Sequence, residues 1–163
     1  MSIKRKIELG VLAGLMTFSG ASVSAQGTRT VLTAESAKTI VAACEAYARE
    51  KGWRLNIAVH DQGKNLMAFL RMDGAQLGSI DIALWKANSA AAFPRPTKAT
   101  ADIAREFPAI GHAPHIAIFE GGEAIFSEDG THLGGAGASG ARGSEDAECV
   151  REGITAAGLK FER

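Results

Sequence analysis

Four histidines of this 163-residue chain are the side chains that could bind a metal or move a proton: His60, His112, His115 and His132. They form no HxH or HExxH pair, and no CxxC or Cys/His cluster accompanies them, so their spacing does not favour a zinc site. A single neutral imidazole can still bind haem iron, because haem needs only one or two protein ligands. The alternative for each histidine is a surface residue without a ligand. We take His132, which lies beside a glycine-rich segment, as the candidate iron ligand, with His60 and His115 as runners-up.

A second group of charged side chains suggests a carboxylate ligand. Arg71 and Asp73 flank the exit of a predicted hairpin, and Lys86 lies on a predicted helix. Arg71 and Lys86 could hold a small carboxylate or a haem propionate. The alternative is an Arg71–Asp73 surface ion pair and a solvated helix face around Lys86. If the ligand is a small carboxylate, His60 with Asp61 or Asp73 could move protons, so these three are the candidate catalytic residues.

Glycines are concentrated in the stretch 133–139 (LGGAGAS), which contains Gly134, Gly135 and Gly137. Gly135, Gly137 and the following Gly140 match the GxGxxG expression of dinucleotide-binding proteins, but they lack the βαβ context and the acidic residue that this fingerprint requires. Two other interpretations remain open. The glycines either allow a strand to pack closely against another element or let the backbone approach a flat ligand, which makes all three candidate ligand-binding residues.

The chain has two cysteines, Cys44 and Cys149, and each lies on a predicted helix face of small residues. Small faces allow two helices to approach closely, so a disulfide becomes possible if the first and last helices pack together. The alternative is a pair of buried free thiols, which behave as small hydrophobic residues.

Hydrophobic periodicity predicts the elements that position these residues. Thr33 is expected to cap a first helix that Gly52 ends, and Ser144 is expected to cap the last one. The predicted order is α-β-β-α-α-β-β-β-α, with an antiparallel sheet in an α+β domain. The predicted strands are residues 54–60, 65–71, 115–120, 123–127 and 133–139, and the middle helices begin at Ser79 and at residue 98.

Composition and the N-terminus indicate where the protein acts. Lys and Arg total 18, as do Asp and Glu, so no excess positive charge suggests a nucleic-acid partner. The basic residues 4–6, the apolar run 9–18 and the small residues before Ala25 have the layout of a secretory signal peptide. We therefore expect residues 1–25 to be removed. Residues 26–163 would form a single periplasmic or secreted domain without a membrane anchor.

Several motifs together resemble a known family. They are IAVHDQGKNLMAFLRMDGA (57–75), ALWKANSAAAF (83–93), GGEAIF (121–126) and GGAGASGARGSEDAECVREG (134–153). The chain is similar to the haem-degrading domain family named for GlcG and HbpS, which is related to the C-terminal domain of PduO-type corrinoid adenosyltransferases. The matched polar positions are Asp61, Arg71, Asp73 and Lys86. His60 departs from the pattern, since an aliphatic residue is usual there.

The resemblance implies a profilin-like α+β fold with a five-stranded antiparallel sheet, a small-molecule ligand and assembly into homo-oligomers. It also implies that an exported member binds haem, and degradation of that haem is a further expectation. The alternative is an enzyme or binding protein for a small carboxylate, such as a hydroxy acid or an aromatic ring-cleavage product. The sequence does not decide whether the protein catalyses a reaction.

Overall fold

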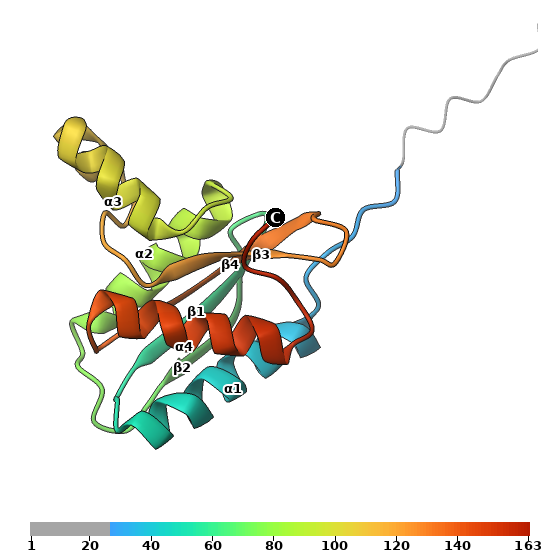
Figure 1. Cartoon of the computed structure of the whole chain (residues 1–163), viewed down its shortest axis with the longest axis horizontal. Helices are drawn as coiled ribbons and strands as arrows, with labels where there is room; N and C mark the ends of the chain where they lie inside the picture. Colours follow the sequence, from blue (N-terminus) through green and yellow to red (C-terminus); the bar gives the residue numbers. More distant parts are fainter. Residues whose placement is uncertain (1–26) are drawn as a thin grey trace, which may run out of the picture.

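A computed structural model describes residues 27–163, so the predicted signal peptide lies outside the described residues. Helices and strands alternate irregularly along the chain (Figure 1). Within this part of the chain, no helix has the length and apolar character needed to cross a membrane. The elements are α1 (Ala34–Lys51), β1 (Asn56–Asp61), β2 (Leu66–Arg71), α2 (Ser79–Ala92), α3 (Thr97–Glu106), the 3₁₀ helix η1 (Pro108–His112), β3 (Gly122–Phe126), β4 (His132–Ser139) and α4 (Gly143–Ala156).

The α+β class with an antiparallel sheet is confirmed, but the sheet has four strands in the order β2-β1-β4-β3, and the prediction of a fifth strand at 115–120 is wrong. That segment is fastened to α2 by side chains. Ser89 Oγ accepts a hydrogen bond from Ala117 N at 2.7 Å, and Asn88 Nδ2 donates to the carbonyl of His115 at 3.0 Å. These bonds hold the start of the segment against α2, and the segment does not join the sheet.

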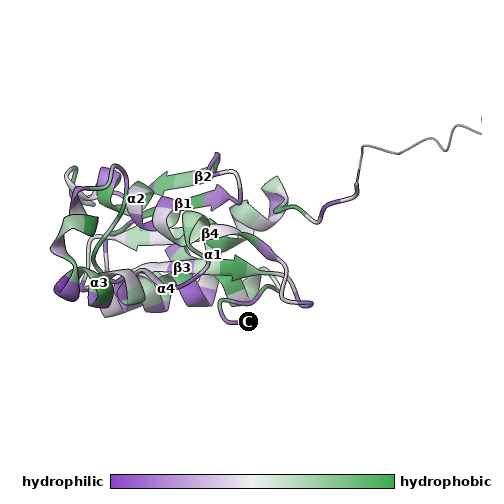
Figure 2. Cartoon of the chain, turned by 90° about the horizontal axis from the view of Figure 1, so that it is seen from above, coloured by the Kyte–Doolittle hydropathy of each residue, from purple (hydrophilic) through white to green (hydrophobic). Residues whose placement is uncertain are grey.

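The two faces of the sheet are covered by different helices. Helices α1 and α4 lie on one face and α2 lies on the other (Figure 1). The hydropathy colouring in Figure 2 shows hydrophobic residues along the strands between these helices. The core under α1 and α4 is built from large aliphatic side chains, including Ile40, Leu55, Ile57, Ile125 and Ile154. The core under α2 is small and consists of Ala58, Ala83 and Ala87.

The glycines of β4 explain how α2 packs. A Cβ atom at Gly135 would lie 2.6 Å from the carbonyl oxygen of Ala87, and one at Gly137 would lie 2.6 Å from that of Ala83. Gly134 is paired on both sides, with Asp61 of β1 and Ile125 of β3. The helix backbone therefore occupies the space beside Gly135 and Gly137. The structure thus supports close packing at Gly135 and Gly137, and a ligand-binding role for the glycines of this strand stays a prediction.

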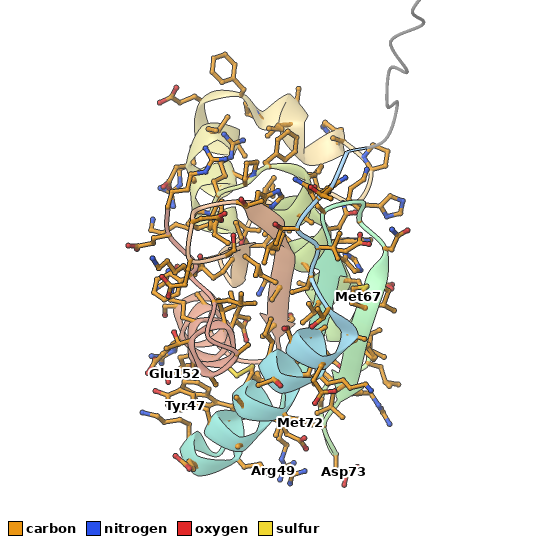
Figure 3. The ribbon with its side chains drawn as sticks, turned by 90° about the vertical axis from the view of Figure 1, so that its right-hand side faces the viewer. Tyr47, Arg49, Met67, Met72, Asp73 and Glu152 are labelled. Carbon is orange, nitrogen blue, oxygen red and sulfur yellow. A yellow bond between two sulfur atoms is a disulfide. The ribbon has the colours of Figure 1, made fainter. Side chains whose placement is uncertain are left out.

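The first and last helices do pack together. Cys44 of α1 and Cys149 of α4 form a disulfide with 4.8 Å between their Cα atoms, visible as the yellow bond in Figure 3. Thr33 accepts a hydrogen bond from Ser36 N at the start of α1, and Gly52 ends that helix in the left-handed conformation, as predicted. The last helix begins two residues earlier than predicted, at Gly143, and a Glu145 carboxylate oxygen, rather than Ser144, accepts from the backbone N–H of Arg142 at its start.

Candidate functional site

The predicted site residues fall into two groups at opposite ends of the sheet. Strand pairing places Arg71 opposite Asn56 and places His60 opposite Leu66. Four residues of strand separate Asn56 from His60, which is about 13 Å. Arg71 and the following Asp73 thus lie at one end, and His60 lies at the other, which we call the histidine end. The structure does not bring Arg71 together with the proton-transfer candidates His60 and Asp61.

The two aspartates at these ends have little in common. Asp61 accepts hydrogen bonds from the backbone and side-chain nitrogens of Asn65 and so shapes the β1–β2 turn. Burial would raise the pKa of Asp61, but the hydrogen bonds from Asn65 outweigh it and lower the pKa. Asp73 is exposed at the lower edge of the molecule in Figure 3. Asp61 is therefore a turn residue held in its ionised form, which makes it a weak base.

Lys86 is buried rather than exposed on a helix face. Its side chain is 3% exposed, and Nζ donates to Asp146 Oδ2 at 2.7 Å and to the carbonyl of Ala138 at 2.8 Å. Asp146 Oδ1 accepts a hydrogen bond from Ala141 N. Burial lowers the pKa of Lys86 and raises that of Asp146, while each partner opposes the shift of the other. Lys86 therefore uses two of its three donors inside the protein, and its role in binding a ligand stays a prediction.

His60 is the more deeply buried histidine of the histidine end. It pairs with Gly135 in the sheet and is 7% exposed. Its Nδ1 atom is buried without a hydrogen-bond partner. Burial lowers the pKa of His60, so the imidazole is neutral at pH 7. A buried ring nitrogen without a partner is uncommon and needs an explanation in terms of function.

His132, at the start of β4, is half-buried. The Nε2 atom lies 2.9 Å from the carbonyl oxygen of Gly134, and the ring centroid lies 5.6 Å from that of Phe126. Because a carbonyl can only accept, Nε2 carries the proton, and Nδ1 keeps the lone pair. Burial lowers the pKa of His132, the carbonyls of Gly134 and Ala90 oppose this, and the positive charge of Arg163 adds to it. The ring is therefore neutral and held in one orientation.

The other two histidines lie outside the strands that form this end. His115 is exposed in the segment that is fastened to α2, and its backbone has a positive φ of 61°. His112 is exposed in η1. Nowhere in residues 27–163 do three or more His, Cys, Asp or Glu side chains gather into a group able to hold a metal ion.

Glu123 of β3 is a buried titratable group that the sequence reasoning missed. It is 1% exposed, and Oε1 accepts from Arg151 Nε at 2.9 Å and Nη2 at 2.7 Å, while Oε2 is buried without a partner. Burial raises the pKa of Glu123 to about 7, against the opposing charge of Arg151. Strand alternation could have found it, because Glu123 and the core residue Ile125 are two positions apart and share a face.

Comparison with known proteins gives one family and several relatives. A family model described as haem degrading protein HbpS-like matches residues 32–155. Protein GlcG of Escherichia coli strain K12 is 33% identical over 113 residues, which cover 69% of this chain and 84% of that protein.

Solved structures share the fold. The crystal structure of a double mutant of Streptomyces reticuli HbpS has a TM-score of 0.75 and 30% identity, covering 84% of this chain and 97% of that one. The crystal structure of a PduOC:heme complex has a TM-score of 0.76 and 22% identity, covering 82% of this chain and 100% of that one.

Proposed function

The chain belongs to the family of HbpS-like haem degrading proteins, and from this premise we propose that it is an exported protein that binds haem through His132 at the histidine end. The observation that carries the proposal is a neutral imidazole with one nitrogen fixed on a carbonyl. Histidines that bind metals almost always donate their other N–H in this way, which fixes the ring and its tautomer. Here the Gly134 carbonyl accepts that hydrogen bond.

The surroundings of His132 fit the rest of a haem. The buried Phe126 ring lies beside the imidazole and supplies an apolar neighbour for a macrocycle. The positive charges of Arg163 and Arg29 act on His132, so the same region favours an anionic ligand. These two residues replace Arg71 and Lys86 as partners for the propionates. When bound, haem would supply an iron centre able to bind or activate oxygen.

Haem would lie on the surface rather than inside a closed cavity. The pocket that reaches Leu133, next to His132, has a volume of about 210 Å³, and Arg29 and Asp61 also line it. Pockets that enclose a drug-sized ligand usually measure ~300–1,000 Å³. A ligand as large as haem would therefore extend beyond this pocket, across the histidine end.

His60 is the second candidate for the iron ligand. Its neutral ring and unpartnered Nδ1 fit a ligand role, but it is only 7% exposed. Because His60 is almost fully buried, neighbouring side chains would have to move before it could bind iron. His132 is half-buried, so binding there needs less movement. We therefore rank His132 first and test both.

Export and assembly are parts of the same proposal. The signal-like segment 1–25 supports export, and so does the Cys44–Cys149 disulfide, because disulfides persist mainly in oxidising compartments. Assembly into homo-oligomers is supported by apolar side chains left exposed on the edge strand β2, namely Leu66 and Phe69. Light scattering of the purified mature protein would give the oligomer size, and a monomer would contradict assembly.

A haem titration tests the binding proposal. We expect the Soret band to shift at micromolar haem with the wild-type protein and the affinity to fall at least tenfold in His132→Ala. His112→Ala is the matched control, since His112 is exposed and belongs to η1 rather than to the sheet. If His60→Ala alone removes the shift, the ligand is His60. No shift in the wild-type protein, or equal losses in the His132 and His112 variants, would refute the proposal.

Degradation is a step beyond binding, and we propose it from the family description alone. It is tested by following the Soret band of the complex after addition of a reductant under air. Irreversible bleaching that requires His132 would support it, and a stable band would contradict it.

A further inference from the structure

A slot of about 220 Å³ opens between the loop after α2 and the C-terminal residues of the chain. Residues 94–96 form one wall, residues 161–163 form the other, and Phe126 lies between them. Figure 1 shows the C-terminal end beside β3, where this slot lies. The two walls lie far apart in the chain, so residue spacing alone does not predict the slot.

Two arginines in the slot have no acidic partner among residues 27–163. The guanidinium carbon of Arg95 lies 5.3 Å from the ring centroid of Phe93, and that of Arg163 lies 5.5 Å from the ring of Phe126. The ion pairs of the described chain involve neither arginine. Glu162 is the acidic side chain that lines the slot, and it is exposed to solvent.

Arg95 carries the clearest sign of a missing partner. Its Nε atom is buried and has no hydrogen-bond acceptor. A buried donor without an acceptor costs roughly 1–3 kcal/mol, so proteins rarely keep one. An anion that accepts from this guanidinium would remove the cost, because the planar fork of arginine matches the two oxygens of a carboxylate.

We infer that the slot binds a carboxylate carried on a flat apolar group. The guanidinium groups would hold the carboxylate, and the rings of Phe126 and Phe161 would contact the flat part of the ligand. A phosphate ion would use the charges but leave the rings without a partner. The slot is smaller than the ~300–1,000 Å³ of pockets that enclose drug-sized ligands, so the part that enters it is about one ring in size.

Two molecules offer this chemistry; the first source is independent of haem binding, and the second rests on the proposed function. One is a free aromatic acid, and the other is the propionate edge of haem. The first arm of the test follows amide chemical shifts of the full mature protein during titration with benzoate. Benzamide, which has the same shape without the charge, is the parallel probe. We expect benzoate to bind at least tenfold more tightly than benzamide and to shift residues of the slot.

Variants of Arg95 locate the binding. Arg95→Gln should lower the affinity for benzoate at least tenfold. The affinity of Arg95→Lys should lie between those of the wild type and the Gln variant, because lysine keeps the charge but lacks the planar guanidinium. Arg105→Gln is the matched control, since Arg105 is an exposed arginine on α3 that pairs with Asp102. A thermal melt shows that each variant is folded. A free aromatic acid is ruled out as the occupant if benzoate and benzamide bind with equal affinity, or if the Arg95 and Arg105 variants have the same affinity for benzoate.

The second arm compares haem with its dimethyl ester, which has no free carboxylate. A tenfold loss of haem affinity in Arg95→Gln, with no change for the ester, would identify the propionates as the occupant. If Arg95→Gln changes neither benzoate nor haem binding, the inference is overturned as a whole. Binding of haem that is lost in His132→Ala but kept in Arg95→Gln would support the proposed function and reject only the propionate arm.

Discussion

The two faces of the sheet are packed by opposite means, although the same strand contributes to both. On one face, Ala136 and Ala138 of β4 join the large aliphatic core under α1 and α4. On the other face, Gly135 and Gly137 of the same strand lie against the backbone of α2. One face is stabilised by apolar side chains removed from water, and the other by the close approach of a helix to a strand.

The difference shows why glycines in a strand say little about ligands by themselves. A strand surface without side chains can pack against either a ligand or a helix. Here it packs against α2, whose alanines allow the helix backbone to come close. The Lys86–Asp146 pair joins the two layers, because it links α2 on one face to α4 on the other. Three substitutions test this contrast, the first at the junction and one on each face.

Asp146→Ala should have the largest effect, because it leaves the Lys86 ammonium buried without its partner. We expect the free energy of unfolding to fall by about 3–5 kcal/mol, as when one member of a buried ion pair is removed. Urea unfolding followed by circular dichroism measures it. Asp102→Ala is the control, since Asp102 forms exposed ion pairs on α3 and should cost about 1 kcal/mol or less. Equal losses would show that the junction does not hold the layers together.

Glu123→Gln tests the large-side-chain face through pH. The pKa of Glu123 in the folded protein, about 7, lies above the ordinary value of 4.5, so the folded state holds a proton that the unfolded state releases. Wild-type stability should therefore fall as pH rises from 4.5 through 7, by about 3 kcal/mol over the whole range. The Gln variant has no carboxyl group to titrate at this position. Its free energy of unfolding should therefore rise relative to that of the wild type between pH 5 and pH 8.

The matched control for this pH series is Glu128→Gln, because Glu128 is exposed and pairs with Lys160 on the surface. Its stability should follow that of the wild type at every pH. A Glu123→Gln curve parallel to the wild-type curve would mean that the buried carboxyl does not titrate in this range.

Gly135→Ala tests the small-residue face and should have the smallest effect. The added methyl group would meet backbone atoms of Ala87 and Ala91, so α2 must shift, at a cost of about 1–3 kcal/mol. Gly78→Ala is the control, because no atom lies within 4 Å of the Cβ position there. Thermal unfolding measures the effect, and the melting temperature of Gly135→Ala should fall below that of Gly78→Ala. No difference between them would show that α2 is free to move away from the strand.

Local signals in the sequence predicted much of the fold. The cap at Thr33, the stop at Gly52 and the first hairpin depend on neighbouring residues, and all three are present. The segment 115–120 has a strand-like pattern, but tertiary contacts with Ser89 and Asn88 decided its conformation. Such contacts between distant parts of the chain are not visible in hydrophobic periodicity.

The candidate site was less predictable than the fold. His60 and His132 do lie at the same end of the sheet, but Lys86 could not be recognised as buried, since its partner Asp146 is 60 residues away. Arg163 was not predicted for the same reason, because only the folded chain brings the C-terminal residues beside the loop after α2. Long-range pairing of charges is thus the information that residue spacing does not contain.

The number of cysteines also limits which incorrect disulfides the chain can form when it is oxidised. The chain has two cysteines, separated by 105 residues, so a single intramolecular pairing exists and no scrambled isomer of one molecule can form. Cys44 is synthesised long before Cys149, and until then any thiol that it meets belongs to another molecule. The one incorrect disulfide product that two copies of this chain can make is a covalent multimer, which a non-reducing gel separates from the correctly closed molecule.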